Sequence, residues 1–129
     1  MMVKARLGNI LVVEDDQDLS EIMRLKLHGE GYEVTCALSL EAALDAVREL
    51  KYDLIFLDLV LGSESGVDLI DEVRADTDHR NYSAPIAVLS GHLDEDKVRE
   101  LRDFIQEGMR KPVPHAEILR IAGRYAGKK

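Results

Sequence analysis

The sequence predicts an α/β domain, built on a doubly wound five-stranded parallel sheet with helices on both faces. Short apolar runs of four or five residues alternate with stretches whose apolar residues recur at helical spacing, which is the pattern of repeated βαβ units. These runs also end repeatedly on polar residues. If the runs are parallel strands of one sheet, these polar residues lie at the shared carboxyl edge, where open α/β sheets place their binding sites. A chain of 129 residues is long enough for one domain with its own core, so we expect residues 1–129 to form a single domain.

The first βα unit follows from residues 10–36. The apolar run 10–13 predicts a strand, and Asp16 or Asp18 can cap the helix after it. Gly29 and Gly31 are expected to end this helix. Residues 32–36 predict the second strand. The residues that should face the core from the helix are Leu19, Ile22, Met23 and Leu27.

The middle of the chain continues the alternation. Ser39 can cap a second helix, and the run 54–57 predicts a strand that is apolar throughout, as strands buried on both faces are. A Gly/Ser-rich loop at 60–66 and a polar surface loop at 76–83 should flank a third helix. The inward residues expected from the two helices are Ala42, Ala43, Ala46, Val47 and Leu50, and then Val67, Leu69, Ile70 and Val73.

The last third predicts two more strands and two helices. Pro85 can open the fourth strand, where a missing N–H is tolerated. The acidic run 94–96 suits the first turn of a helix, and residues 108–110 form a short fifth strand. Pro114 fits the first turn of the final helix. Its expected inward residues are Ile118, Leu119, Ile121 and Ala122.

Four of the predicted strands end on groups that could handle phosphate. Glu14 and Asp15 follow the first strand, Asp58 the third, Ser90 the fourth and Lys111 the fifth. If these strands are parallel neighbours, the carboxylates, the hydroxyl and the ammonium meet in one cleft. Such a set suits Mg²⁺, or Mn²⁺ in its place, together with a phosphoryl group attached to an aspartate.

These residues, in this order and at this spacing, resemble the receiver domain of bacterial two-component response regulators over nearly the whole chain. The resemblance includes Gly66, eight residues after Asp58, and the Lys111-Pro112 pair, which it implies is joined by a cis bond. It also implies the flavodoxin-like strand order 2-1-3-4-5, which has a switch point between strands 1 and 3.

The resemblance assigns a role to each site residue. Asp58 is the expected phosphoacceptor, with Ser90 and Lys111 assisting phosphoryl transfer. Asp15 and Asp58 are expected to ligate Mg²⁺ directly, Glu14 through water, and Val60 through its backbone carbonyl. We therefore expect a signalling domain, not an enzyme, that assists its own phosphorylation and dephosphorylation and changes its protein-interaction surface.

Each site residue also has a simpler explanation. An acidic pair after a strand is usually a solvated turn or helix cap, Ser90 could cap the next turn, and Lys111 could be a surface lysine. Asp58 is harder to explain in this way, because a carboxylate that follows a fully apolar run needs a partner. If the chain had no phosphate-handling site, all of these simpler explanations would have to hold at once.

Two positions depart from the family pattern. Gly62 stands where the family usually has proline, so we expect a more mobile loop. Gly108 stands where the family usually has an aromatic residue that moves on phosphorylation, so the usual switch is in question. The stretch between Ser90 and Lys111 could contain a shortened or shifted helix.

Three functional hypotheses remain open. The favoured one is a phosphoacceptor receiver, either free-standing or part of a larger protein. The second is a module of the same fold that interacts without phosphorylation. The third is an aspartate-nucleophile phosphohydrolase, which Val60 disfavours because such enzymes usually carry a second aspartate at that position.

The expected partners are a sensor histidine kinase or phosphotransfer protein and an unknown output protein. The formal net charge of −8 disfavours direct binding to nucleic acid. No apolar run is long enough for a secretory signal or a membrane span, so we expect a cytoplasmic protein that does not contact a membrane. The lone Cys36 is expected to be a small core residue.

Overall fold

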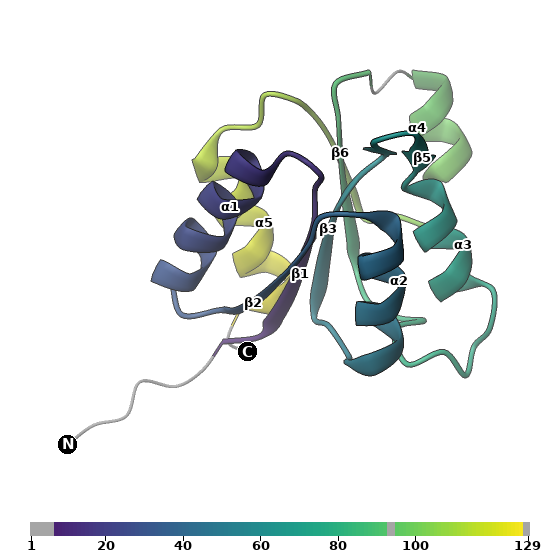
Figure 1. Cartoon of the computed structure of the whole chain (residues 1–129), viewed down its shortest axis with the longest axis horizontal. Coiled ribbons are helices and arrows are strands. Elements are labelled where there is room, and N and C mark those ends of the chain that lie inside the picture. The colour runs from purple at the N-terminus through teal and green to yellow at the C-terminus, as the bar shows by residue number, and fades with distance from the viewer. Residues whose placement is uncertain (1–6, 93–94, 128–129) are drawn as a thin grey trace.

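The structure is a computed structural model that describes residues 7–92 and 95–127. Five parallel strands form the central sheet in the order β2-β1-β3-β6-β7, with helices on both of its faces (Figure 1). This arrangement confirms the predicted fold class and the flavodoxin-like order, since β6 and β7 are the fourth and fifth long strands. The strands are β1 (Asn9–Val13), β2 (Glu33–Ala37), β3 (Leu54–Asp58), β6 (Ile86–Ser90) and β7 (Glu107–Arg110).

The helices divide between the two faces of the sheet. One face carries α1 and α5, and the other carries α2, α3 and α4 (Figure 1). In β3, Leu54 and Phe56 pack toward the first group while Ile55 and Leu57 pack toward the second, so both faces of this strand are buried. The helices are α1 (Gln17–Gly29), α2 (Leu40–Glu49), α3 (Val67–Arg74), α4 (Glu95–Leu101) and α5 (His115–Ala126).

Local sequence signals explain where the first two helices begin. The Asp16 side chain accepts a hydrogen bond from the Leu19 N–H, and Ser39 accepts one from the Ala42 N–H. Both caps were predicted, Asp16 as one of two candidates. Pro114 directly precedes α5. The predicted start of α4 includes Asp94, which lies outside the described residues.

Most of the predicted inward residues are buried, but three are exposed. Ile22 and Leu50 are 41% and 54% exposed, and Ala42 is exposed as well. In α1 the buried stripe runs instead through Ser20, Met23 and Leu27. Ile22 lies one residue away from that stripe, and each helical residue turns the side chain by about 100°. The prediction that Ile22 faces the core was therefore wrong. It was also wrong for Ala42 and Leu50, which are exposed in α2 and directly after it.

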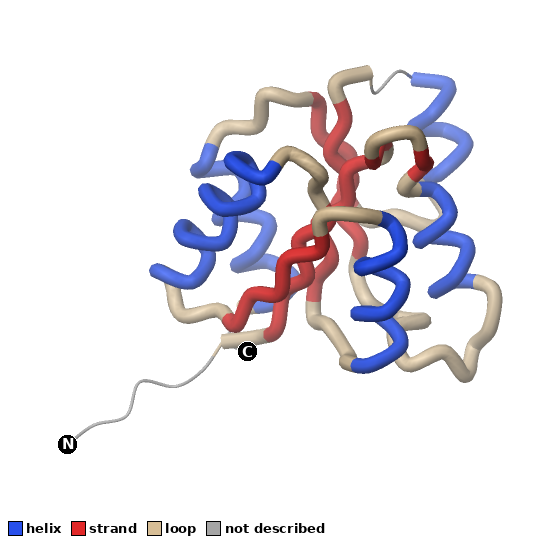
Figure 2. Tube along the Cα trace, in the orientation of Figure 1, coloured by secondary structure: helices blue, strands red, loops and turns tan. Residues whose placement is uncertain are grey.

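The glycine-rich stretch after Asp58 is not an irregular loop throughout. It contains an antiparallel hairpin of β4 (Val60–Leu61) and β5 (Glu64–Ser65), with Gly62 and Ser63 in the turn. Gly62 has a φ of +63°, which suits the first residue of a two-residue hairpin turn. Figure 2 shows this hairpin in red at the upper end of the sheet.

The loop at 76–83 is more firmly attached than its polar sequence suggested. Asn81 is completely buried. Its side-chain amide donates to the carbonyls of Val47 and Leu50, both at 2.7 Å, and its carbonyl accepts from the Tyr52 N–H at 2.7 Å. These bonds satisfy backbone groups at the end of α2 and the start of β3.

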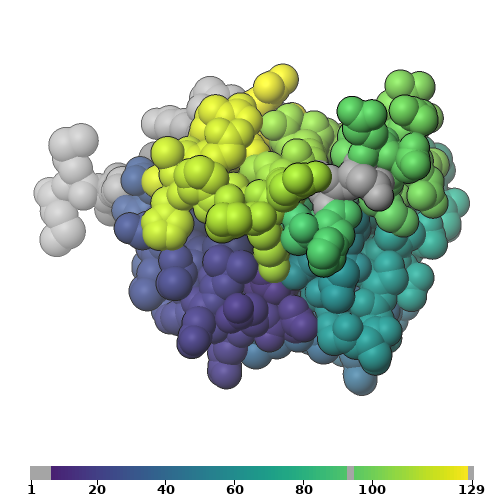
Figure 3. Space-filling model, turned by 90° about the horizontal axis from the view of Figure 1, so that it is seen from above, coloured from purple at the N-terminus to yellow at the C-terminus, as the bar shows by residue number. Residues whose placement is uncertain are grey.

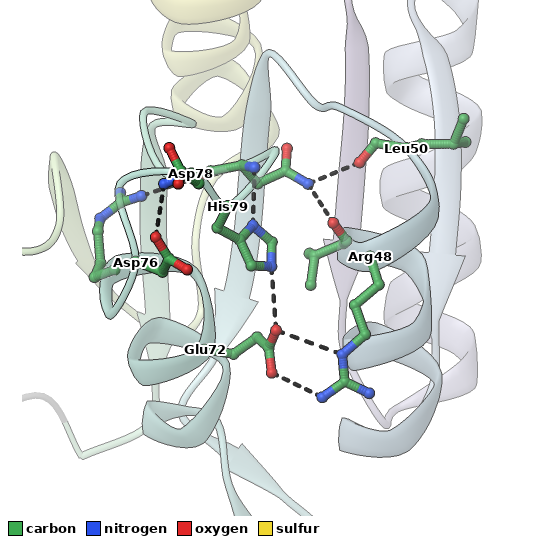
Figure 4. A network of polar contacts seen from close by, with 9 residues as sticks. Arg48, Leu50, Glu72, Asp76, Asp78 and His79 are labelled. Carbon is green, nitrogen blue, oxygen red and sulfur yellow. Dashed lines mark hydrogen bonds and ion pairs between the residues drawn. The ribbon is translucent and has the colours of Figure 1, made fainter.

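A second set of contacts joins this loop to α2 and α3 (Figure 4). His79 accepts the Asn81 N–H at Nδ1 and lies 3.1 Å from Glu72 through Nε2. Glu72 also pairs with Arg48 at 2.7 Å. Only 12% of the His79 side chain is exposed, so the histidine is part of this contact network and not a freely solvated surface residue.

In the part of the chain that the structure describes, no helix is long and apolar enough to span a membrane.

Candidate functional site

The structure brings the predicted site residues together at the carboxyl edge of the sheet. Asp58 and Ser90 are the last residues of β3 and β6, and Glu14, Asp15 and Lys111 lie just after β1 and β7. Figure 3 looks onto this edge from above, where segments from different parts of the chain meet. The parallel register of β1, β3, β6 and β7 makes this convergence unavoidable.

Asp58 lies at the centre of the site and is only 5% exposed. Its Oδ1 atom accepts the Val60 N–H at 3.0 Å, and its Oδ2 atom accepts a hydrogen bond from Lys111 Nζ at 2.7 Å. Gly66 packs against the same residue, because a Cβ at position 66 would lie 2.3 Å from the Asp58 carbonyl oxygen. The expected glycine is thus required by a close approach of two backbone segments.

Glu14 is completely buried and also contacts Lys111. The Lys111 ammonium donates to Glu14 Oε1, and the Asp16 N–H donates to Glu14 Oε2 at 3.2 Å. Burial raises the pKa of Glu14 to about 7, although the hydrogen bond from Lys111 opposes this shift. Burial alone would lower the pKa of Lys111, but its hydrogen bonds to Asp58 and Glu14 raise it overall.

Asp15 is exposed and faces the hairpin. Its Oδ2 atom accepts the Gly62 N–H at 2.9 Å. Glu14, Asp15 and Asp58 each offer one carboxylate oxygen, and these three oxygens lie within 4.8 Å of one another. A cluster of hard oxygen donors at this separation could hold a divalent cation.

Ser90 follows Leu89, the residue that pairs with Asp58 in the neighbouring strand, and it is 3% exposed. Its Oγ atom accepts the His92 N–H at 3.2 Å, and its carbonyl accepts the Lys111 N–H at 2.9 Å. The Lys111–Pro112 peptide bond is cis. A cavity of about 350 Å³ opens beside Ser90, and Val60, His92 and the β4–β5 hairpin line it.

A second cavity, of about 410 Å³, lies between α1 and α5 next to the site. Its lining is mainly apolar and includes Leu19, Met23, Val113 and Ile118, and Lys111 forms part of its wall. This cavity could not be predicted from the sequence, because an apolar residue on a helical stripe shows the same spacing whether it fills a core or lines a cavity.

Gly108 is exposed in β7, where it pairs with Val88. A shallow cavity of about 190 Å³ lies beside it, lined by Val98, Ile105 and Glu107 among others. The described part of α4 has seven residues.

Comparison with known proteins shows the family. A model of the response regulator receiver domain matches residues 10–122. The chain therefore belongs to the receiver domains of response regulators, which act in two-component signalling with histidine kinases.

Relatives of known name agree with this assignment. The chain is 36% identical over 111 residues to proteins named DNA-binding response regulator MtrA from Mycolicibacterium smegmatis and from Mycobacterium tuberculosis. These matches cover 85% of this chain but 46% of each relative. The chain thus spans about half the length of the curated relatives that it matches, and their name describes proteins of about twice its size.

Solved structures show the same fold. The receiver domain of the Francisella response regulator 1452 superimposes with a TM-score of 0.78 at 25% identity, over 92% of this chain and 96% of that one. A response regulator from Burkholderia pseudomallei gives a TM-score of 0.76 at 28% identity, over 86% and 64% of the two chains. That structure is described as containing a phosphorylated aspartic acid, a calcium ion and citrate.

Proposed function

We propose that the chain, as one receiver domain over residues 1–129, accepts a phosphoryl group from a phosphohistidine onto Asp58. The observation that carries this proposal is the position of Asp58, which is buried, accepts a hydrogen bond from the Lys111 ammonium and clusters with two further carboxylates. A buried carboxylate with both kinds of neighbour matches what an aspartyl phosphate needs, namely a cation site and a fixed positive charge.

A divalent cation fits the donor set. Mg²⁺ prefers one or two carboxylates together with water and phosphate oxygens, and Mn²⁺ accepts similar ligands. Asp15 and Asp58 would ligate it directly, Glu14 through water, and Val60 through its backbone carbonyl. When bound, such a cation offsets the repulsion between the Asp58 carboxylate and the incoming phosphoryl oxygens.

The transfer itself requires little covalent chemistry from the chain. An oxygen of Asp58 forms a bond to phosphorus as the phosphorus–nitrogen bond of the phosphohistidine breaks, and the electron pair returns to the imidazole nitrogen. Lys111 and Ser90 would contact phosphoryl oxygens, since both already lie around Asp58. The Val60 N–H holds Asp58 Oδ1 and so fixes the orientation of the carboxylate.

The partner that supplies the phosphoryl group would be a sensor histidine kinase or a phosphotransfer protein. The cavity between α1 and α5 supports a protein donor, because the partly exposed Leu19 and Val113 offer apolar contacts beside Lys111. The output partner would be another protein that responds to the changed surface. For this chain, direct binding to nucleic acid remains disfavoured by its charge of −8.

Intact-mass measurement after incubation with Mg²⁺ and a small phosphodonor tests the proposal. A single phosphoryl adduct that disappears in Asp58→Asn and persists in Asp71→Asn, an exposed aspartate on α3, is the expected result. No adduct would favour an interaction module that works without phosphorylation. Consumption of the donor without an adduct would favour a phosphohydrolase.

A further inference from the structure

The three clustered carboxylates share one feature. Each has one oxygen bound to a backbone N–H: Glu14 Oε2 to Asp16, Asp58 Oδ1 to Val60 and Asp15 Oδ2 to Gly62, at 3.2, 3.0 and 2.9 Å. The second oxygens of Glu14 and Asp58 accept from Lys111. Within residues 7–92 and 95–127, Asp15 Oδ1 is the one oxygen of the six without a hydrogen bond.

The bond from Gly62 to Asp15 joins residues that are 47 positions apart and depends on the hairpin turn. At φ +63°, Gly62 adopts a backbone conformation that other residues rarely take. Nothing lies within 4 Å of the place that a Cβ would occupy, so the position does not exclude a side chain by volume. What the site uses at position 62 is the left-handed backbone and the N–H that it directs toward Asp15.

A carboxylate with one oxygen held in this way presents its other oxygen singly to a cation. Mg²⁺ favours near-octahedral ligation by single oxygens, whereas Ca²⁺ readily accepts both oxygens of a carboxylate and more ligands in total. Hydrogen bonds to a ligating carboxylate also orient it and raise the affinity of the site.

We propose that Gly62 is a positioning residue for the cation site, and that its N–H keeps Asp15 a one-oxygen ligand and so favours Mg²⁺ over Ca²⁺. The inference rests on the proposed function, because it presumes that Asp15 ligates the cation. It adds a determinant of ion selectivity that lies in the hairpin and contributes no ligand of its own.

Titrations of the full chain with MgCl₂ and with CaCl₂, followed by calorimetry without any phosphodonor, test this inference on three variants. Gly62→Pro removes the N–H and also the left-handed backbone, because the proline ring fixes φ at about −65°. It should weaken Mg²⁺ binding by about 10- to 100-fold, with a smaller loss for Ca²⁺. Gly62→Asn keeps the N–H and tolerates positive φ, so it should stay close to wild type. Gly62→Ala keeps the N–H and measures the effect of backbone strain alone.

Hydrogen exchange of the Gly62 amide in wild type gives a readout that does not depend on a substitution. The amide should exchange slowly both in EDTA and at saturating Mg²⁺, because the bond to Asp15 persists when the cation binds. Faster exchange with Mg²⁺, or tighter Mg²⁺ binding by Gly62→Pro, would overturn this inference but not the proposed function. The same holds if Gly62→Pro loses equal affinity for Mg²⁺ and Ca²⁺. A wild type that binds no Mg²⁺ would overturn the proposed function as well.

Discussion

Lys111 Nζ lies 2.7 Å from Asp58 Oδ2, although the two residues are 53 positions apart in the chain. The same ammonium donates to Glu14, whose carboxylate is completely buried. One cation therefore serves two carboxylates that would otherwise face each other in a region of low dielectric. The raised pKa of Lys111 keeps this ammonium charged throughout the physiological range of pH.

Replacing this ammonium should cost stability. Lys111→Met should lower the free energy of unfolding by about 2 kcal/mol in EDTA, less than for a fully buried pair because the lysine is partly exposed. Urea unfolding measures the change, and Lys51→Met, at an exposed lysine, is the matched control. Mg²⁺ should stabilise Lys111→Met more than wild type. A variant as stable as wild type would show that the contact makes no net contribution.

Asp15→Asn should have opposite effects with and without Mg²⁺. In EDTA the variant should melt at a higher temperature than wild type, because one of three clustered negative charges is lost. Mg²⁺ at ten times its dissociation constant should stabilise wild type by about 1.4 kcal/mol and the variant by much less. A lower melting temperature in EDTA, together with a wild type insensitive to Mg²⁺, would contradict the cluster's proposed role.

The lifetime of the phosphoryl group should depend on Val60. Its side chain is 55% exposed and lines the cavity beside Ser90 together with His92. An apolar side chain cannot orient a water for attack on phosphorus, so the wild-type adduct should persist for minutes or longer. Val60→Asn should shorten the lifetime, and Val60→Ile should leave it unchanged. Intact mass over time measures both, and equal lifetimes for all three proteins would refute the explanation.

The contact between Arg48 and Glu72 should make stability depend on pH. The hydrogen bond from Arg48 lowers the pKa of Glu72 below its ordinary value of 4.5. A lowered pKa stabilises the fold above pH 4.5, and this contribution is lost as pH falls through the folded-state value. Glu72→Gln should therefore be less stable than wild type at pH 6, with a difference that shrinks toward pH 3. Glu49→Gln, at an exposed position, should show no such trend.

Much of the fold could be predicted because its signals are local. Apolar runs mark the strands, Asp16 and Ser39 mark the starts of helices, and parallel strands bring their carboxyl ends to one edge. The meeting of Asp58 and Lys111 at that edge follows from these local signals. Strand order came from the family resemblance, because periodicity carries no information about which strands are neighbours.

What could not be predicted depends on contacts between distant residues. The role of Asn81 arises because its amide matches unpaired backbone groups of α2 and β3, and nothing around position 81 indicates those partners. The Gly62 N–H reaches Asp15 only after the hairpin has formed. Whether Ile22 is exposed depends on how α1 is rotated about its own axis against the sheet. A shift of one residue along the helix turns the side chain by about 100°, which is enough to move it from the core to the surface.

The central claim is that Asp58 is the phosphoacceptor, and mapping of the modified residue tests it most directly. The phosphorylated chain is treated with borohydride, which reduces an aspartyl phosphate to homoserine, and its peptides are then sequenced by mass spectrometry. The account predicts homoserine at position 58 alone, and none anywhere in Asp58→Asn. Homoserine at Glu14's neighbour Asp15 or at another aspartate, or an adduct that survives in Asp58→Asn, would contradict it.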